Sequence, residues 1–165
     1  PIKAYIDQIE DKSLTILIPG CGNGHEGSYL FENGFKNVHL LDFAIEPLNA
    51  FKRKNQLFPA ENLHNEDFFN HQGQYDLIIE QTLFCAIEPS LRLKYAEKLN
   101  SLLKENGKVI GLLFNRDFQG GPPFGGNNEE YATYFNPNFS SVKMEECYNS
   151  ISPRKGTELF IQFKK

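Results

Sequence analysis

A run of branched apolar residues that stops at three closely spaced glycines constrains this chain more than any other feature. The segment LTILIP covers residues 14–19, and Gly20, Gly22 and Gly24 follow it directly. A strand that is apolar throughout, without polar alternation, is typical of a strand buried on both faces of a parallel sheet. The sequence therefore predicts an α/β fold in which a bare backbone turn follows the first strand.

The rest of the chain continues to alternate strand and helix patterns. Further strands are expected at 38–43, weakly at 62–66, at 75–81 and at 108–114, and helices at 25–33, 45–54, from Ser90 to the ENG segment at 105–107, and at 129–135. Ser90 can cap its helix, and the segments 142–150 and 157–165 resemble a hairpin. This order predicts a doubly wound, Rossmann-like, mostly parallel sheet with helices on both faces and a C-terminal antiparallel hairpin.

Composition sets the class of protein. The chain has 165 residues, of which 40% are hydrophobic and 23% charged, so residues 1–165 are expected to form a single globular domain. No apolar run approaches the roughly 20 residues of a membrane span. The net charge is −4, and the longest basic cluster is KRK at 52–54, which argues against a nucleic-acid partner. Three widely spaced cysteines form no disulfide or zinc pattern, so a cytoplasmic location is expected.

The predicted sheet indicates where the chemistry lies. In such sheets ligands bind beyond the carboxyl ends of the strands. Gly20 to Gly24 follow the first strand there, and Asp42 ends the second. Glycine lets the backbone approach a ligand closely, and a carboxylate can accept hydrogen bonds from both hydroxyls of a ribose. The pair favours a nucleoside ligand, although the glycines could be a plain turn and Asp42 a solvated strand end or the cap of the next helix.

Two further strand ends carry candidate side chains. Asp67, with Phe68 and Phe69, could read the edge and the face of an adenine, unless the aromatic rings belong to the core. Glu80, Gln81 and Thr82 close the next strand, where polar groups would face the tail of the ligand or simply meet solvent.

Other chemistries find little support. The four histidines, His25, His39, His64 and His71, show no metal-binding spacing, so no metal site is expected. Cys85 lies near the expected site but has no partner that would activate it, and we interpret it as a buried filler. The chain contains no P-loop and no G-x-S-x-G motif.

Three blocks resemble class I S-adenosylmethionine-dependent methyltransferases, and more narrowly the thiopurine, thiol and halide methyltransferase family. They are ILIPGCGNGHE at 16–26, YDLIIEQTLFCAIEPSLRLKYAEKLNSLLKENGKVIGLLF at 75–114, and GGPPF at 120–124. The middle block, with FCAIEP followed by an arginine, is very similar to plant halide and thiol methyltransferases. The resemblance implies a seven-stranded sheet and S-adenosylmethionine as the cofactor.

The resemblance also implies roles for individual residues. Gly20, Cys21, Gly22 and Gly24 would form the cofactor-binding turn behind the methionine part, with Asp42 on the ribose and Phe43 against the adenine. Asp67 and Phe68 would read the adenine, and Gln81 would lie near the methionine tail or the methyl group. Phe84, Pro122, Pro123 and Phe124 would belong to the acceptor side, with Gln81 and Phe84 positioning the reactants. No general base is identified.

Two departures from the family pattern bear on the acceptor. The family has a tryptophan-containing segment before the first strand, whereas this chain has no Trp, so that cover is expected to be short or missing. The segment EQTLF lacks the arginine of thiopurine-type relatives, which favours a thiol, a halide or thiocyanate as the small acceptor over a thiopurine. The protein is expected to be a monomer or a weak dimer.

Three alternatives to this function stay open at this stage. A Rossmann oxidoreductase would use Asp42 equally well, but the glycine spacing is wrong for it and no Tyr-x-x-x-Lys pair is present. A binding module without turnover would keep the same fold. A macromolecular methyltransferase is disfavoured because the chain has neither an N-P-P-Y motif nor a basic face.

Overall fold

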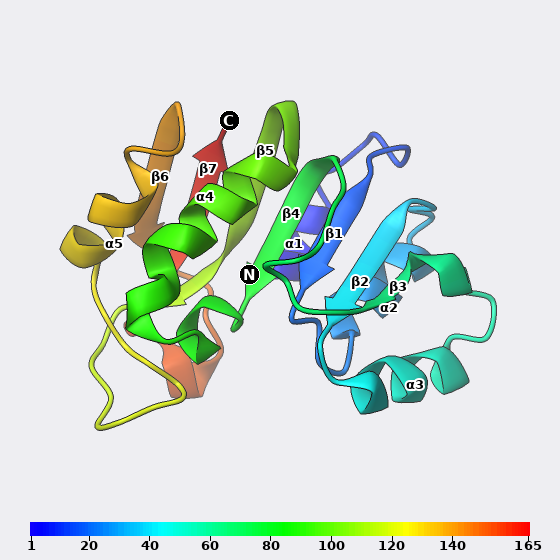
Figure 1. Cartoon of the computed structure of the whole chain (residues 1–165), viewed down its shortest axis with the longest axis horizontal. Helices are drawn as coiled ribbons and strands as arrows, with labels where there is room; N and C mark the ends of the chain where they lie inside the picture. The colour runs from blue at the N-terminus through cyan, green and yellow to red at the C-terminus, as the bar shows by residue number, and fades with distance from the viewer.

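The protein is built around one seven-stranded sheet (Figure 1). In the computed structural model, which describes residues 1–165, the strand order is β3-β2-β1-β4-β5-β7-β6. The strands are β1 (Ile16–Pro19), β2 (Val38–Asp42), β3 (Leu63–Asn65), β4 (Tyr75–Gln81), β5 (Leu103–Phe114), β6 (Ser141–Glu146) and β7 (Glu158–Lys164). Strands β1 to β5 pair in parallel, and β7 runs antiparallel to both of its neighbours. The predicted mostly parallel sheet and its antiparallel C-terminal pair are confirmed.

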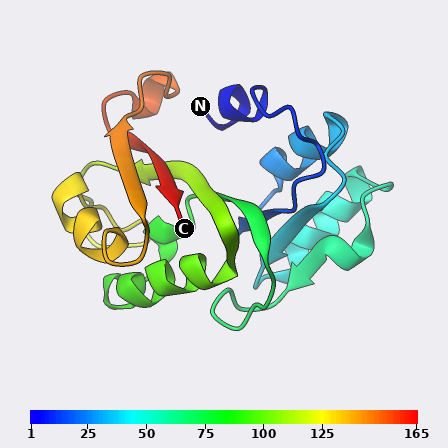
Figure 2. The ribbon, with the colours of Figure 1, turned by 90° about the horizontal axis from the view of Figure 1, so that it is seen from above.

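Helices cover both faces of the sheet. They are α1 (Ile2–Ile6), α2 (His25–Glu32), α3 (Ile45–Lys54), α4 (Arg92–Leu102) and α5 (Asn128–Phe135), with short 3₁₀ turns η1 (Ala60–Asn62), η2 (Phe84–Ala86), η3 (Pro89–Leu91) and η4 (Ser152–Arg154). Figure 2 shows α1 and α4 on opposite sides of the sheet. Buried residues of α1, α2 and α3 share one hydrophobic core, and those of α4 and α5 share the other.

The spacing of apolar residues explains how each helix docks. In α4 the buried residues Tyr95, Ala96, Leu99 and Leu102 recur at intervals of one, three and three, which places them on one face of the helix. In α2, Gly27 lies so close to β2 that an added Cβ would stand 2.6 Å from Leu40. These contacts fix the helices over the central strands and leave the carboxyl ends of the strands open.

Two local predictions were wrong, and one helix was not predicted. Helix α1 was not expected, because five residues carry too little periodicity to be recognised. Helix α4 begins at Arg92, and no side chain caps it, because Ser90 lies within the 3₁₀ turn η3. The ENG segment 105–107 does not end the helix but lies inside β5, where Asn106 adopts a φ of 63° at an irregularity opposite the start of β4. Asparagine tolerates this left-handed conformation better than most residues.

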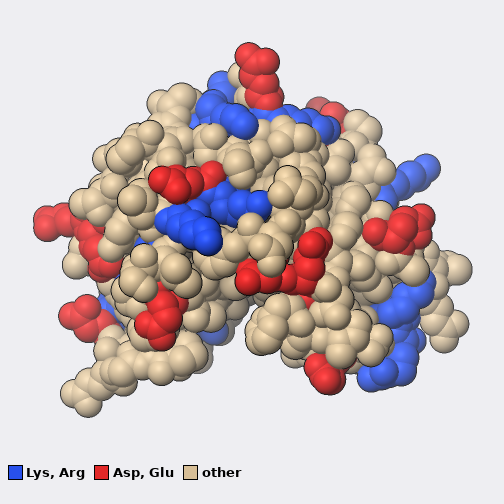
Figure 3. Space-filling view, viewed as in Figure 1, with Lys and Arg blue, Asp and Glu red and all other residues tan.

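The surface carries both signs of charge without a large patch of one sign on the face in view (Figure 3). The lower edge of that face is notched between the two halves of the molecule, at the end of the sheet where β1 and β4 finish (Figures 1 and 3). No helix of the protein is long and apolar enough to cross a membrane.

Candidate active site

The glycine turn after β1 uses its glycines for different reasons. Gly20, Gly22 and Gly24 have φ values of 60°, 50° and 66°, a region that L side chains rarely adopt. A Cβ on Gly24 would stand 2.4 Å from the ring of Phe51, whereas a Cβ on Gly22 would meet nothing within 4 Å. Gly24 therefore permits helix packing, and Gly22 presents bare backbone to open space.

The side chain of Asp42 faces this turn. Its Oδ2 accepts a hydrogen bond from the backbone N–H of Gly22 at 2.9 Å, and its Oδ1 accepts one from Ala44 at 3.0 Å. Asp42 is buried, with 9% of its surface exposed. Asn65, at the end of β3, holds the same strand end by donating to the backbone oxygens of Asp42 and Phe43 at 3.1 and 2.9 Å. The carboxylate of Asp42 thus joins the end of β2 to the glycine turn, and Asn65 joins the end of β3 to the backbone of the same residues.

A cavity of about 530 Å³ opens beside this carboxylate. Most of its lining is apolar, with a few polar groups. The lining residues are Gly20, Leu41, Asp42, Phe43, Asp67, Phe68, Phe69, Thr82, Leu83, Ala86, Ile87 and Leu91. The structure therefore brings together five of the predicted cofactor residues at the carboxyl ends of β1, β2 and β3.

Those five residues differ in what holds them. Phe43 is 81% exposed and stands at the rim of the cavity, whereas Phe68 is buried. Asp67 is exposed, and its Oδ1 accepts a hydrogen bond from the N–H of Phe69 at 2.8 Å. The sequence did not single out the apolar wall formed by Leu83, Ile87 and Leu91. They lie within the block 75–114 that resembles the family, but no role was predicted for them, because they reach the cavity only through the 3₁₀ turns after β4.

Gln81 lines a different cavity. This second cavity has a volume of about 260 Å³ and includes Pro1, Glu26, Gln81 and Arg154. A very small third space, bordered by Thr82, Cys85 and Arg154, lies between the two cavities and shares residues with each. The candidate site is therefore divided at the end of β4, with Gln81 and Thr82 on either side.

Thr82 holds a strained conformation at this division. Its φ is 76°, which is a genuine outlier for a β-branched residue. The thiol of Cys85 donates to the carbonyl of Thr82 at 3.1 Å and helps to hold it. Strain of this kind costs on the order of 1–3 kcal/mol and tends to collect at functional sites.

Glu80 supports the turn from below rather than facing a ligand. It is 1% exposed, and it accepts hydrogen bonds from the hydroxyl of Tyr95 and from the N–H of Phe84, the latter at 3.0 Å. Burial raises the pKa of Glu80 to about 7, against the opposing effect of these hydrogen bonds. Its role here is to position η2, which carries part of the cavity wall.

Several predicted acceptor-side residues lie outside the 530 Å³ cavity. Phe84 is 1% exposed and packs in the core, with its ring 4.7 Å from the guanidinium carbon of Arg92. Pro122 and Pro123 are exposed on the loop after β5, and Phe124 of the same loop donates its N–H to the carbonyl of Cys85 at 2.6 Å. The structure therefore places Phe84 beneath the site and the two prolines on its outer side.

The cysteines provide no nucleophile. Cys21 is buried behind the glycine turn, where burial first and the charge of Asp42 second raise the pKa of its thiol to about 12. Burial raises the pKa of Cys85 to about 11, with a further contribution from Glu80. A thiol with a raised pKa is almost entirely protonated at neutral pH and reacts poorly. The interpretation of Cys85 as a buried filler agrees with this burial.

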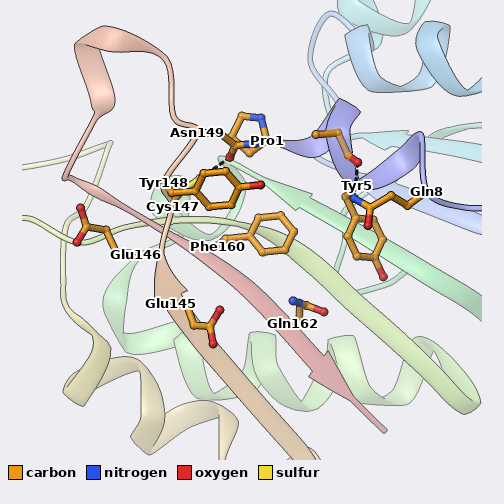
Figure 4. A pocket seen from close by; sticks show the side chains of 11 residues that line it. Pro1, Tyr5, Gln8, Glu145, Glu146, Cys147, Tyr148, Asn149, Phe160 and Gln162 are labelled. Atoms are coloured by element: carbon orange, nitrogen blue, oxygen red, sulfur yellow. Dashed lines mark hydrogen bonds between the residues drawn. The ribbon is translucent and has the colours of Figure 1, made fainter.

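A fourth cavity lies between α1 and the C-terminal strands, apart from Cys21, Cys85 and Asp42. Figure 4 shows its side chains, with Tyr5 of α1 facing Phe160 of β7; their ring centroids are 6.0 Å apart. Its volume is about 270 Å³, and it shares no residue with the cavity beside Asp42. It contains no predicted site residue.

Comparison with solved structures identifies the fold. The fold matches a magnesium protoporphyrin IX methyltransferase from Synechocystis with bound S-adenosylhomocysteine (TM-score 0.77, 14% identity, covering 99% of this chain and 81% of the other). It also matches a 1,6-didemethyltoxoflavin N1-methyltransferase from Burkholderia thailandensis (TM-score 0.74, 17% identity, covering 100% and 76%). The fold is that of a Rossmann-like S-adenosylmethionine-dependent methyltransferase.

Sequence comparison then identifies the family. Residues 1–162 match the thiopurine S-methyltransferase family, and the chain belongs to that family. It is 31% identical to a probable thiol methyltransferase 2 of Arabidopsis thaliana over 175 residues (100% of this chain, 76% of the relative). It is 32% identical to a thiocyanate methyltransferase 1 of Brassica oleracea over 166 residues (95% and 74%). The protein is therefore an S-adenosylmethionine-dependent methyltransferase.

Proposed function

We propose that this enzyme transfers the methyl group of S-adenosylmethionine to a small anionic nucleophile, most simply a thiolate or thiocyanate. One observation carries the assignment of the cofactor site. The carboxylate of Asp42 is held against the N–H of Gly22 at the mouth of a largely apolar cavity of about 530 Å³. That arrangement offers a bare backbone, a carboxylate and an apolar slot to one nucleoside.

The adenosine part fits the cavity beside Asp42. Each carboxylate oxygen has two lone pairs and uses one of them on a backbone N–H, so each can still accept a ribose hydroxyl. Phe43 and Phe68 offer aromatic faces to the adenine, and Asp67 offers an acceptor for its exocyclic amine. The methionine part then passes along the backbone of Gly20 and Gly22 toward Gln81.

The second cavity suits the acceptor. Arg154 lines it together with Gln81, and the Nη1 of Arg154 lies 3.2 Å from the carboxylate of Glu158. Because 37% of the Arg154 side chain is exposed, its remaining N–H groups can attract an anion. The relatives named for thiol and thiocyanate methylation support an acceptor of this kind.

The reaction needs no general base when the acceptor is a thiolate. A lone pair of the acceptor sulfur forms the new S–C bond while the bond between the methyl carbon and the sulfonium sulfur breaks. The electron pair of that bond returns to the cofactor sulfur, which leaves as a neutral thioether. The protein would contribute alignment, and Gln81, which lines the second cavity, would position the methyl group.

The first experiment tests the cofactor site by calorimetry with S-adenosylhomocysteine. Asp42→Ala should weaken binding by about 1–3 kcal/mol, because it removes a partner of the ribose and leaves the N–H of Gly22 unpaired. Asp11→Ala is the matched control, since Asp11 lies in an exposed turn before β1. Equal affinity of the wild type and Asp42→Ala would refute the ribose assignment.

A second experiment tests the acceptor. Labelled methyl transfer to small thiols, thiocyanate and iodide should proceed, and Arg154→Gln should raise KM for the anionic acceptors without changing the affinity for S-adenosylhomocysteine. Normal cofactor binding with no transfer to any acceptor would indicate a binding module without turnover. An unchanged KM would remove Arg154 from the acceptor site.

The location and assembly of the enzyme belong to the same proposal. The three cysteines are free and buried, which supports a reducing, cytoplasmic compartment. A monomer or weak dimer is expected, and light scattering during size exclusion measures this directly.

A further inference from the structure

Three of the four histidines converge although their sequence spacing gives no sign of it. His39 lies in β2, His64 in β3 and His71 in the connection between β3 and β4. The Nδ1 of His39 is 2.9 Å from the Nε2 of His64, and the ring centroids of His64 and His71 are 4.9 Å apart. The parallel pairing of β2 with β3 creates this cluster, because it places His64 beside Leu41, two positions along the strand from His39.

Glu66 completes a set of metal-ligating groups. His64, Glu66 and His71 each offer one ligand atom, and these atoms all lie within 4.8 Å of one another. The Nδ1 of His71 is 2.7 Å from Oε1 of Glu66. Two imidazoles and one carboxylate are a ligand set that suits zinc and neighbouring divalent transition metals.

The outer partners of the cluster are also in place. The Nε2 of His71, on the side of the ring away from Glu66, is 2.7 Å from the hydroxyl of Tyr75. A histidine that binds a metal through one nitrogen usually donates its other N–H to such a partner, which fixes the orientation of the ring. His71 is buried while the side chain of Glu66 is 41% exposed, so the cluster combines a rigid base with access from solvent.

We propose that His64, Glu66 and His71 bind a divalent transition metal ion of the zinc class, with water in the fourth position. Binding through Nδ1 of His71 would place the ring proton on Nε2, which can donate it to the hydroxyl of Tyr75. Tetrahedral ligands at about 2.0–2.1 Å from zinc lie roughly 3.3 Å apart. The 2.7 Å separation between His71 and Glu66 therefore has to open by a few tenths of an ångström, which the exposed Glu66 side chain permits.

Such an ion would have a structural role. Between β3 and β4 the chain forms a turn rather than a helix, and β3 has only three residues. A metal ion joining His64 in the strand to Glu66 and His71 in the connection would fasten this segment to the edge of the sheet. Asp67 and Phe68, which line the 530 Å³ cavity, lie inside the fastened segment.

The test measures zinc binding to the full chain after chelator treatment. Calorimetry with zinc chloride should give one saturable site, and zinc should raise Tm because it binds only the folded state. His64→Gln and His71→Gln should abolish the site, whereas His25→Gln, which changes the one histidine outside the cluster, should keep it. No saturable binding, or equal binding by His64→Gln and the wild type, would overturn the proposal and leave a hydrogen-bonded histidine cluster.

Two measurements keep the test decisive if His71→Gln fails to fold. Glu66→Gln changes an exposed side chain and should weaken zinc binding at least about tenfold without altering the circular dichroism of the apo protein. Tyr75→Phe removes only the outer partner of His71 and should weaken binding by about 10–100-fold. X-ray absorption should show nitrogen and oxygen ligands near 2.0 Å, whereas sulfur ligands near 2.3 Å would place the metal on a cysteine and refute the assignment.

Discussion

The glycine turn after β1 and the loop after β5 border the same end of the sheet but are held in different ways. In the turn, residues 20–24, the left-handed glycines set the backbone, and the N–H of Gly24 donates to the carbonyl of Cys21 at 2.8 Å. In the loop, residues 115–127, the principal anchor is remote: the guanidinium of Arg92 donates to the carbonyl of Gly125 at 2.8 Å and to Glu130 at 2.7 Å. The turn is set mainly by the conformation of its glycines and one carboxylate, whereas the loop relies on a buried guanidinium from α4.

This difference predicts which substitutions destabilise the glycine turn and which destabilise the loop after β5. The cofactor half should survive changes elsewhere in the protein, because its backbone conformation comes from glycine and one carboxylate. The loop after β5 depends on a buried cation, Arg92, which is 1% exposed and whose Nε has no hydrogen-bond partner.

Arg92→Ala should be the most damaging change. It removes the donor to two loop carbonyls and to Glu130, and each hydrogen bond to a charged group contributes about 1.5–3 kcal/mol to the unfolding free energy. Hydrogen exchange should speed up at the amides of Phe124 and Gly126 but not at Gly24. Arg92→Lys should rescue little, because lysine lacks the planar fork. Equal loss of protection at Gly24 would break the comparison.

Glu80→Gln should reveal that the contribution of Glu80 to the unfolding free energy depends on pH. The pKa of Glu80 is about 7 in the folded state and 4.5 as the reference value, so the folded state keeps a proton that the unfolded state loses. The contribution of Glu80 to stability is therefore fully present below pH 4.5 and is lost as pH rises through 7.

Urea titrations of both proteins at several pH values check this sign. The stability of Glu80→Gln relative to the wild type should rise between pH 4.5 and pH 7 by about 3 kcal/mol, because one pKa unit corresponds to about 1.4 kcal/mol. Groups common to both proteins cancel in this difference. A flat difference across that range would mean that Glu80 is ionised throughout.

Gly24→Ala and Gly34→Ala form a matched pair for the glycine turn. Both positions have positive φ, but a Cβ on Gly24 would meet Phe51 at 2.4 Å, while a Cβ on Gly34 would meet nothing within 4 Å. Gly34→Ala should cost about 1 kcal/mol for the backbone alone. Gly24→Ala should cost about 2 kcal/mol more for the steric overlap. Equal Tm values for the two variants would show that Phe51 moves aside.

Thr82→Gly should have the smallest effect and the opposite sign. Glycine adopts a φ of 76° without strain, so the variant should gain about 1 kcal/mol in unfolding free energy, net of the extra freedom of the unfolded chain. Thr82→Ala keeps the Cβ and should gain less. If both variants lose stability, the backbone of Thr82 is not strained, and the Thr82 side chain contributes to stability instead.

The sequence predicted most of the fold because the strands are apolar on both faces and the helices carry regular periodicity. The four residues of β1 are all buried, as the run at 14–19 indicates. The errors fall where local signals are short or are overruled by pairing: five-residue α1, the 3₁₀ turn at Ser90, and Asn106 inside β5. At Asn106 the pairing of β5 with β4 decided the outcome.

In the candidate site, too, some features could be predicted from the sequence and others could not. The sequence by itself determined the glycine turn and Asp42, because a φ that only glycine adopts easily and a carboxylate at a strand end are properties of single residues. Only the tertiary structure decided that Phe84 lies in the core, that Arg92 holds the loop, and that three histidines meet beside Glu66. These arrangements depend on tertiary contacts, and the spacing of residues along the sequence does not predict such contacts.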